Sequence, residues 1–144
     1  MPTFELTIDI TAPVSVVWAL NTEPTRWPEL TPTVTSVRWH DDGPLRVGRA
    51  ATVKQPGQKA TVWTVTVLEP EQRFVWEASV NGVRTVATHL VELLAGTNGV
   101  TRNTLRLDMT GRGAGLFGAL LGRRLRKILR TEADGFKAAA EAAR

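Results

Sequence analysis

Apolar and polar residues alternate along residues 4–10, Phe4-Glu5-Leu6-Thr7-Ile8-Asp9-Ile10. A period of two is typical of a strand with one buried face. Similar strand-like stretches cover roughly 34–40, 47–55, 59–68, 73–80, 83–94 and 100–109. The connections between them are short, and Asn81-Gly82 and Asn98-Gly99 favour tight hairpins, so we expect an antiparallel meander.

Three other segments lack this alternation. Residues 12–20 predict a short helix with Pro13 in its first turn, and the proline-rich residues 26–32 predict a fixed loop or a second short helix. After the glycines of residues 111–115, apolar residues recur three and four apart, which predicts one long amphipathic helix. Its apolar positions are Leu116, Phe117, Leu120, Leu121, Leu125, Ile128, Leu129, Phe136 and Ala140.

The 144 residues fit one domain, 1–144, because a chain of this length buries enough surface for an ordinary core. A helix with no other partner layer must pack on the sheet. We therefore expect an α+β fold. It has a curved antiparallel sheet of about seven strands wrapped on a long C-terminal helix, with two short helices after the first strand.

This order of elements resembles the START-like or helix-grip superfamily (SRPBCC), with its polyketide cyclase/dehydrase and lipid-transport group. The matching stretches are residues 10–18, 26–32, 45–48, 63–70 and 74–77, together with His89. The resemblance implies a helix-grip fold with a hollow between sheet and helix. It leaves the activity open, because the superfamily includes ligand carriers, cyclases and dehydratases.

Strand parity assigns one set of side chains to the concave face of the sheet. We expect these residues to line a hollow that binds a ligand, since ligand pockets are mostly apolar with a few placed polar groups. The predicted lining is Trp63, Val65, Val67, Phe74, Trp76, Ala78, Ala87, His89, Val91, Leu93, Leu105, Leu107 and Met109, with Phe117 and Leu121 from the helix. Trp27 and Trp39 are placed either at the mouth of the hollow or in the packed core.

His89 has the parity of the inward-facing residues of its strand. Three roles stay open: a hydrogen-bonded core histidine, a polar anchor for a ligand, or, if the protein is an enzyme, a general acid or base. The last role needs a second group that orients or tunes the imidazole, and parity places Glu77, Glu92 and Asp108 on the outer face. No catalytic residue other than His89 is proposed.

Several kinds of site are not expected. The sequence contains no cysteine, and His40 and His89 have no third ligand at a recognisable spacing, so we predict no metal site and no cofactor. Residues 111–115 lie between a strand and a helix, but the P-loop lysine is missing. We interpret these glycines as a chain reversal.

The net charge of +4 and the pI near 10.3 raise the question of a nucleic-acid partner. The densest basic run, residues 123–130, is interrupted by apolar residues at helical spacing, which indicates the solvated face of a helix. We expect no nucleic-acid partner, no transmembrane segment, a cytoplasmic location, and a monomer or a homodimer.

The hypothesis we favour from sequence is binding or carriage of a small hydrophobic molecule, aromatic, polyketide-like or lipid-like, in an internal cavity. One alternative is an aromatase/cyclase or dehydratase that uses the same cavity, with His89 assisting proton transfer. The other is a protein or membrane interaction domain with a filled core.

Overall fold

A computed structural model describes residues 2–97 and 99–143, and it confirms the predicted α+β helix-grip architecture. The hairpin expected at Asn98-Gly99 includes Asn98, which lies outside the described residues. The helical elements are α1 (Val14–Thr22), the 3-10 turn η1 (Pro24–Arg26), α2 (Trp27–Leu30) and α3 (Ala114–Ala143). The strands are β1 (Thr3–Ile10), β2 (Ser36–Trp39), β3 (Ala50–Lys54), β4 (Thr61–Glu69), β5 (Arg73–Val80), β6 (Val83–Leu93) and β7 (Thr101–Gly111).

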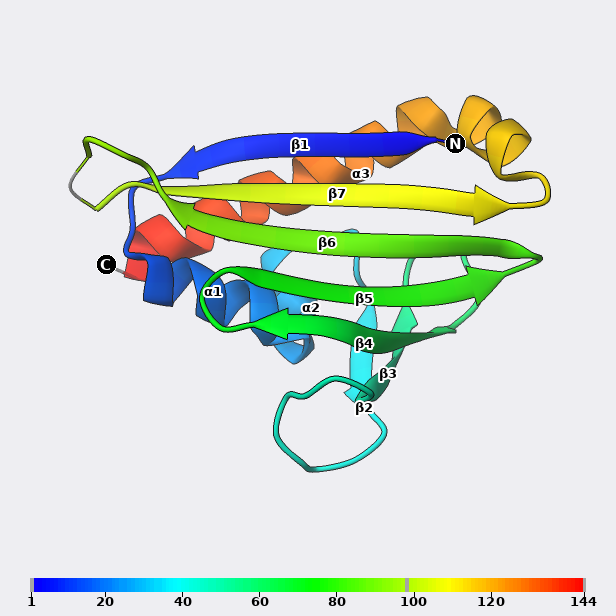
Figure 1. Cartoon of the computed structure of the whole chain (residues 1–144), viewed down its shortest axis with the longest axis horizontal. Helices are drawn as coiled ribbons and strands as arrows, with labels where there is room; N and C mark the ends of the chain where they lie inside the picture. The colour runs from blue at the N-terminus through cyan, green and yellow to red at the C-terminus, as the bar shows by residue number, and fades with distance from the viewer. Residues whose placement is uncertain (1, 98, 144) are drawn as a thin grey trace.

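The seven strands form one antiparallel sheet with the order β1-β7-β6-β5-β4-β3-β2 (Figure 1). The meander from β2 to β7 follows the chain, as the short connections predicted. The first strand pairs with the last, from Thr3 opposite Asp108 to Ile10 opposite Thr101. This pairing brings the start of the chain to the sheet edge that α3 crosses.

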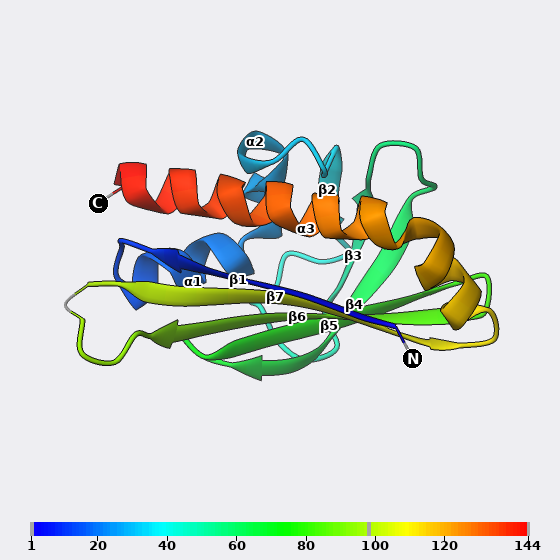
Figure 2. The ribbon, with the colours of Figure 1, turned by 90° about the horizontal axis from the view of Figure 1, so that it is seen from above.

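Helix α3 runs across one face of the sheet, and α1 and α2 lie on the same side near its C-terminal end (Figure 2). Glycines allow the close approach. Added Cβ atoms at Gly118 and Gly122 would meet Pro2 and Phe4, and one at Gly135 would collide with the carbonyl of Leu30. The helix therefore contains glycine where it touches its neighbours, although glycine weakens an isolated helix.

A β-bulge in β4 changes which residues face inward. The register shifts between Val65 and Val67, so that Val65 pairs with Trp76 and Val67 pairs with Val75. Leu68, not Val67, packs against the core, and the prediction that Val67 lines the hollow is wrong because strict alternation does not continue through a bulge. Leu93 was also expected inside, but at the end of β6 it is 60% exposed.

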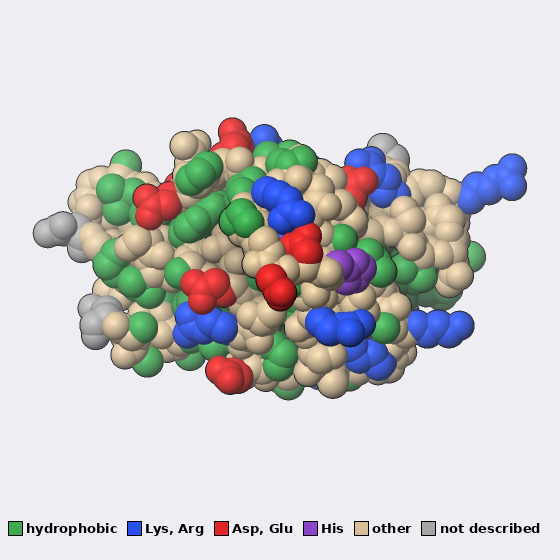
Figure 3. All heavy atoms as spheres, turned by 90° about the horizontal axis from the view of Figure 1, so that it is seen from below, with side chains coloured by type: hydrophobic (Ala, Val, Ile, Leu, Met, Phe, Trp, Pro, Cys, Tyr) green, Lys and Arg blue, Asp and Glu red, His purple; other side chains and the backbone are tan. Residues whose placement is uncertain are grey.

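The outer surface carries basic and acidic side chains interspersed, as the face drawn in Figure 3 shows. Glu77 forms an ion pair with Arg84 at 2.7 Å, and Asp108 forms one with Arg106 at 2.8 Å. The outward placement of these carboxylates and of the exposed Glu92 is confirmed. Among the described residues, no helix is long and apolar enough to cross a membrane.

Candidate functional site

Three tryptophans from three strands meet on the inner face of the sheet. Trp76 on β5 is buried, and its ring centre lies 6.0 Å from that of Trp39 on β2 and 5.7 Å from that of Trp63 on β4. They are neighbours because Trp39 and Trp63 both pair with Ala51, whose small side chain leaves space between them. We call Trp39, Trp63 and Trp76 the tryptophan row. Trp39 and Trp63 are only half-buried.

Trp39 is held in place by a charged cluster in the loop between β2 and β3. The guanidinium of Arg49 lies 4.0 Å from the ring centre of Trp39, and its Nε donates to Asp41 Oδ1 at 3.1 Å. Hydrogen bonds from Arg46, from the amide of Gly43 and from Arg49 lower the pKa of Asp41 to about 2. Asp41 is therefore ionised at neutral pH and fixes the arginine over the indole.

His89 projects from β6 into the centre of the packed interior, as its parity predicted. It is 5% exposed, and its Nδ1 lies 2.8 Å from Oδ1 of Asn21 on α1. Burial lowers the pKa of His89 to about 4, so the imidazole is neutral at pH 7. Asn21 supplies the orienting partner that sequence reasoning did not identify. The signal for it was weak: Val17, Leu20 and Asn21 share one helical face.

Trp27 covers the imidazole of His89. The two rings are nearly parallel, with an interplanar angle of 21° and centres 5.4 Å apart. The indole Nε1 of Trp27 donates to the carbonyl of Leu20 at 2.9 Å, and the residue is 6% exposed. Of the two placements left open by the sequence, the structure gives Trp27 the packed one, while Trp39 lies half-buried at the less covered end of the interior.

Glu132 on α3 is a titratable group that sequence analysis missed. Its Oε1 accepts a hydrogen bond from Oγ1 of Thr33 at 3.0 Å, and Thr33 lies 3.0 Å from the hydroxyl of Thr31. Burial of the carboxyl raises the pKa of Glu132 to about 7, although the residue as a whole stays partly accessible. The signal was its position, three residues after Leu129 and four before Phe136, beside the apolar stripe.

Asn103 on β7 is a second missed polar residue. It has the parity of Leu105, Leu107 and Met109, which face inward, and it is fully buried. Neither its Nδ2 nor its Oδ1 has a hydrogen-bond partner among the described residues. Its neighbour Thr101, also buried, donates to the carbonyl of Ala12 at 2.7 Å. Buried polar atoms are nearly always paired, so Asn103 requires an explanation.

Most of the predicted lining lies together on the inner face. Leu107, Leu121 and Trp63 are half-buried, whereas Phe117 is 39% exposed at the start of α3. The predicted lining residues that are buried are Val65, Phe74, Trp76, Ala78, Ala87, His89, Val91, Leu105 and Met109. The lining is thus tightly packed around His89 and less covered toward the first turns of α3.

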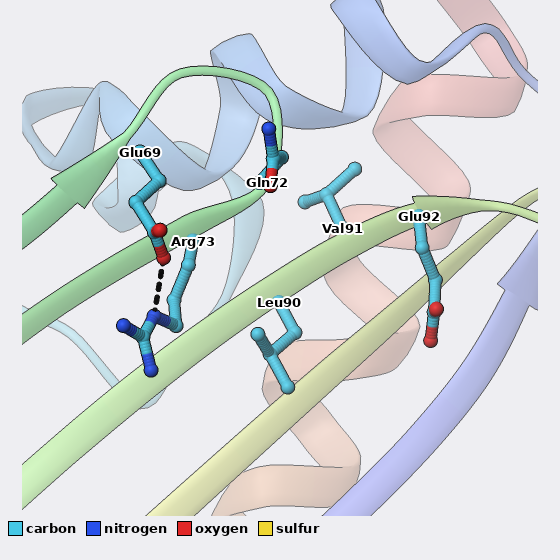
Figure 4. A pocket seen from close by; sticks show the side chains of 6 residues that line it. All are labelled: Glu69, Gln72, Arg73, Leu90, Val91 and Glu92. Atoms are coloured by element: carbon cyan, nitrogen blue, oxygen red, sulfur yellow. Dashed lines mark hydrogen bonds and ion pairs between the residues drawn. The ribbon is translucent and has the colours of Figure 1, made fainter.

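Two surface hollows lie outside this packed centre. A groove of about 400 Å³ separates α3, at Arg124 and Ile128, from Thr33 and from Pro56 in the β3–β4 turn. The other, of about 370 Å³, lies beside the β4–β5 turn, where Leu90 and the ion-paired Glu69 and Arg73 line it (Figure 4). Within the described part of the chain, no three His, Cys, Asp or Glu side chains are grouped to hold a metal ion.

Comparison with known proteins adds a family and a set of similar folds. The family model described as polyketide cyclase / dehydrase and lipid transport matches residues 1–141. No curated protein matches the sequence.

Three similar solved structures are a hypothetical protein from Helicobacter pylori, the Zhui aromatase/cyclase from Streptomyces sp. R1128, and the di-domain ARO/CYC BexL from the BE-7585A biosynthetic pathway. The Helicobacter protein has a TM-score of 0.79 at 16% identity, covering 96% of this chain and 86% of that one. The match to Zhui has a TM-score of 0.70 at 16% identity and covers 99% of this chain and 92% of Zhui. The match to BexL has a TM-score of 0.75 at 21% identity and covers 96% of this chain but only 46% of BexL. At these identities the likeness shows the fold alone.

Proposed function

The chain belongs to the polyketide cyclase/dehydrase and lipid transport family, and we propose that it binds a small, largely hydrophobic aromatic molecule between its sheet and α3. The family and the ARO/CYC folds support a ligand-binding or cyclase role. The observation that carries the proposal is the fall in burial along the tryptophan row. Trp76 is 3% exposed, whereas Trp39 and Trp63, on the same inner face, are half-buried.

Half-covered indoles on an inner face favour an apolar partner. Removing apolar surface from water contributes roughly 25 cal/mol per Å², and an offset or edge-on aromatic contact adds roughly 0.5–1.5 kcal/mol. The helix does not cover this end fully, because α3 packs mainly on β1 and β7, whereas the tryptophan row lies on β2, β4 and β5 toward the other edge of the sheet. An aromatic ligand beside Trp39 and Trp63 supplies the missing apolar contacts.

Calorimetric titration with 2-naphthol, a soluble two-ring probe, tests this role. We expect Trp63→Ala to weaken binding by about tenfold, the equivalent of about 1.4 kcal/mol. The matched control is Val62→Ala, one residue away on β4 and 50% exposed, which should leave the affinity unchanged. Native mass spectrometry of the purified chain would show whether a hydrophobic molecule accompanies it. Absence of 2-naphthol binding, or equal loss in both variants, contradicts the proposal.

A cyclase-type activity is a second candidate, favoured by the hydrogen bond through which Asn21 orients His89, since a general acid or base needs such an orienting partner. Incubation with a linear poly-β-keto thioester should then give an ultraviolet-absorbing aromatic product, and His89→Ala should abolish its formation. Equal product formation with and without protein rules out this activity.

A further inference from the structure

The interior contains two polar side chains whose hydrogen-bonding capacity is incompletely used. The described residues give His89 Nδ1 a partner and give Nε2 none. Asn103 is fully buried, and no described residue forms a hydrogen bond with either of its amide atoms. A buried donor or acceptor without a partner costs roughly 1–3 kcal/mol, so the two buried amide atoms of Asn103 point to a polar partner from outside the chain. His89 Nε2 offers a further polar atom to such a partner.

The bonding of Asn21 determines which hydrogen-bonding role His89 Nε2 can play. Asn21 Nδ2 donates to the carbonyl of Val17 at 2.8 Å, so its Oδ1 is the atom that faces His89. An amide oxygen only accepts, and therefore His89 Nδ1 carries the proton and donates it. In the neutral imidazole the other nitrogen, Nε2, is then an acceptor.

Asn103 lies close to His89 on the same face of the sheet. The register pairs His89 with Leu105 and Val91 with Asn103, so His89 and Asn103 are diagonal neighbours on β6 and β7. Diagonal neighbours are typically about 7–8 Å apart, within reach of one small group placed between their side chains. Such a group meets an acceptor on His89 and both a donor and an acceptor on Asn103.

We propose that His89 Nε2 and Asn103 recognise a hydroxyl group on the aromatic ligand, with the hydroxyl donating to His89 Nε2 and its oxygen accepting from Nδ2 of Asn103. This inference rests on the proposed function and names the class of ligand: a phenol or another hydroxylated aromatic. A ketone, an ether or a plain hydrocarbon cannot donate to Nε2. A site built to bond a hydroxyl discriminates strongly against analogues lacking it, because its own polar atoms then stay unpaired.

Calorimetric titration with 2-naphthol, 2-methoxynaphthalene and 2-fluoronaphthalene tests this selectivity. For the native sequence we expect 2-naphthol to bind at least tenfold more tightly than either analogue. His89→Phe should bring the three affinities to within about twofold. Leu90→Ala, which changes the adjacent residue of β6 whose side chain has the opposite parity, is the control and should keep the preference.

Asn103→Leu separates recognition from a structural role and does not depend on the folding of the histidine variant. Since no described residue bonds the amide, the variant should be at least as stable to urea as the native chain, yet lose the preference for 2-naphthol. A loss of stability with the preference intact would overturn the inference.

Equal affinity of the native chain for all three naphthalenes would also overturn the inference but leave the proposed function standing. Failure of all three to bind would overturn both.

Discussion

The two halves of α3 meet the rest of the protein in different ways. In the C-terminal half, one stripe is buried against the sheet and the short helices: Leu129, Ala133, Phe136 and Ala140. In the N-terminal half, the buried positions include Gly118 and Gly122, whereas Leu116 is 66% and Leu120 73% exposed. Large side chains pack inward at one end and lie in solvent at the other.

The difference indicates that the two ends of α3 have different roles. At the C-terminal end, Phe136 lies against Trp27 and His89, with ring centres 5.9 and 6.3 Å away, so this end holds the fold together. At the N-terminal end, Gly118 and Gly122 bring the helix against Pro2 and Phe4. We therefore expect the C-terminal end to hold His89 in position and the less covered N-terminal end to give a ligand access to it.

The largest effect is expected from Phe136→Ala. Removing this fully buried ring leaves a cavity beside Trp27 and His89 and should lower the free energy of unfolding by about 3–5 kcal/mol. Urea denaturation followed by tryptophan fluorescence measures this change. The matched substitution at the other end, Phe117→Ala, should cost less than about 1 kcal/mol. Equal costs would remove the distinction between the two halves.

Replacing glycine by alanine should lower the stability at Gly135, in the C-terminal half of α3, and raise it at Gly115, in the N-terminal half. An alanine methyl at Gly135 collides with the Leu30 carbonyl, so Gly135→Ala should destabilise by about 1–3 kcal/mol. At Gly115, near the start of α3, nothing lies within 4 Å of an added Cβ, and Gly115→Ala should stabilise by up to about 1 kcal/mol. Thermal unfolding would show this contrast, and a stabilised Gly135→Ala would contradict the contact.

The pH dependence of stability tests the buried titratable groups. Glu132 has its pKa raised from 4.5 to about 7, so its contribution is complete below pH 4.5 and lost as the pH rises to 7. His89 has its pKa lowered from 6.5 to about 4, so its contribution is complete above pH 6.5 and lost as the pH falls to 4. Between pH 4.5 and 6.5 the two groups oppose each other.

Single variants should reveal the contribution of each group to the pH dependence of the free energy of unfolding, on the order of 1–3 kcal/mol between pH 4.5 and 6.5. Stability of Glu132→Gln should rise with pH between 4.5 and 6.5, whereas stability of His89→Phe should fall. Urea midpoints at several pH values measure both. Curves parallel to that of the native chain would show that these groups titrate as in the unfolded state.

The smallest effect is expected at the exposed leucines of the N-terminal half. Leu120→Ser removes an apolar side chain that is 73% exposed, so the free energy of unfolding should change by no more than about 0.5 kcal/mol. A thermal melt of this variant beside the native chain checks the value. A loss above about 2 kcal/mol would mean that the N-terminal half is packed as firmly as the C-terminal half.

Sequence periodicity predicted the fold because each element has a strong local pattern. Alternation from Phe4 to Ile10 and across the later strands reflects one buried face, and spacing of three and four reflects the α3 stripe. The turn of Val67 away from the core was not predictable, because the β-bulge arises from pairing between β4 and β5. Periodicity describes one chain segment at a time, whereas register depends on two.

The candidate site was predictable only in part, for a related reason. Parity alone placed His89 inside, but its partner Asn21 is 68 residues away on α1 and is brought to it by packing. Glu132 lies beside the apolar stripe of α3, and Asn103 has the parity of the inward-facing residues of β7. Because both side chains are polar, a pattern of hydrophobic positions does not include them. Polar residues at inward positions were the available signal.

The proposed function places an aromatic ligand in the interior, beside the tryptophan row. Nuclear Overhauser contacts between 2-naphthol and the labelled protein test it most directly. We expect contacts from the naphthol ring protons to the indoles of Trp63 and Trp76 and to the imidazole of His89. Contacts confined to the exposed Leu116 and Leu120, or no contacts at saturating 2-naphthol, would contradict it.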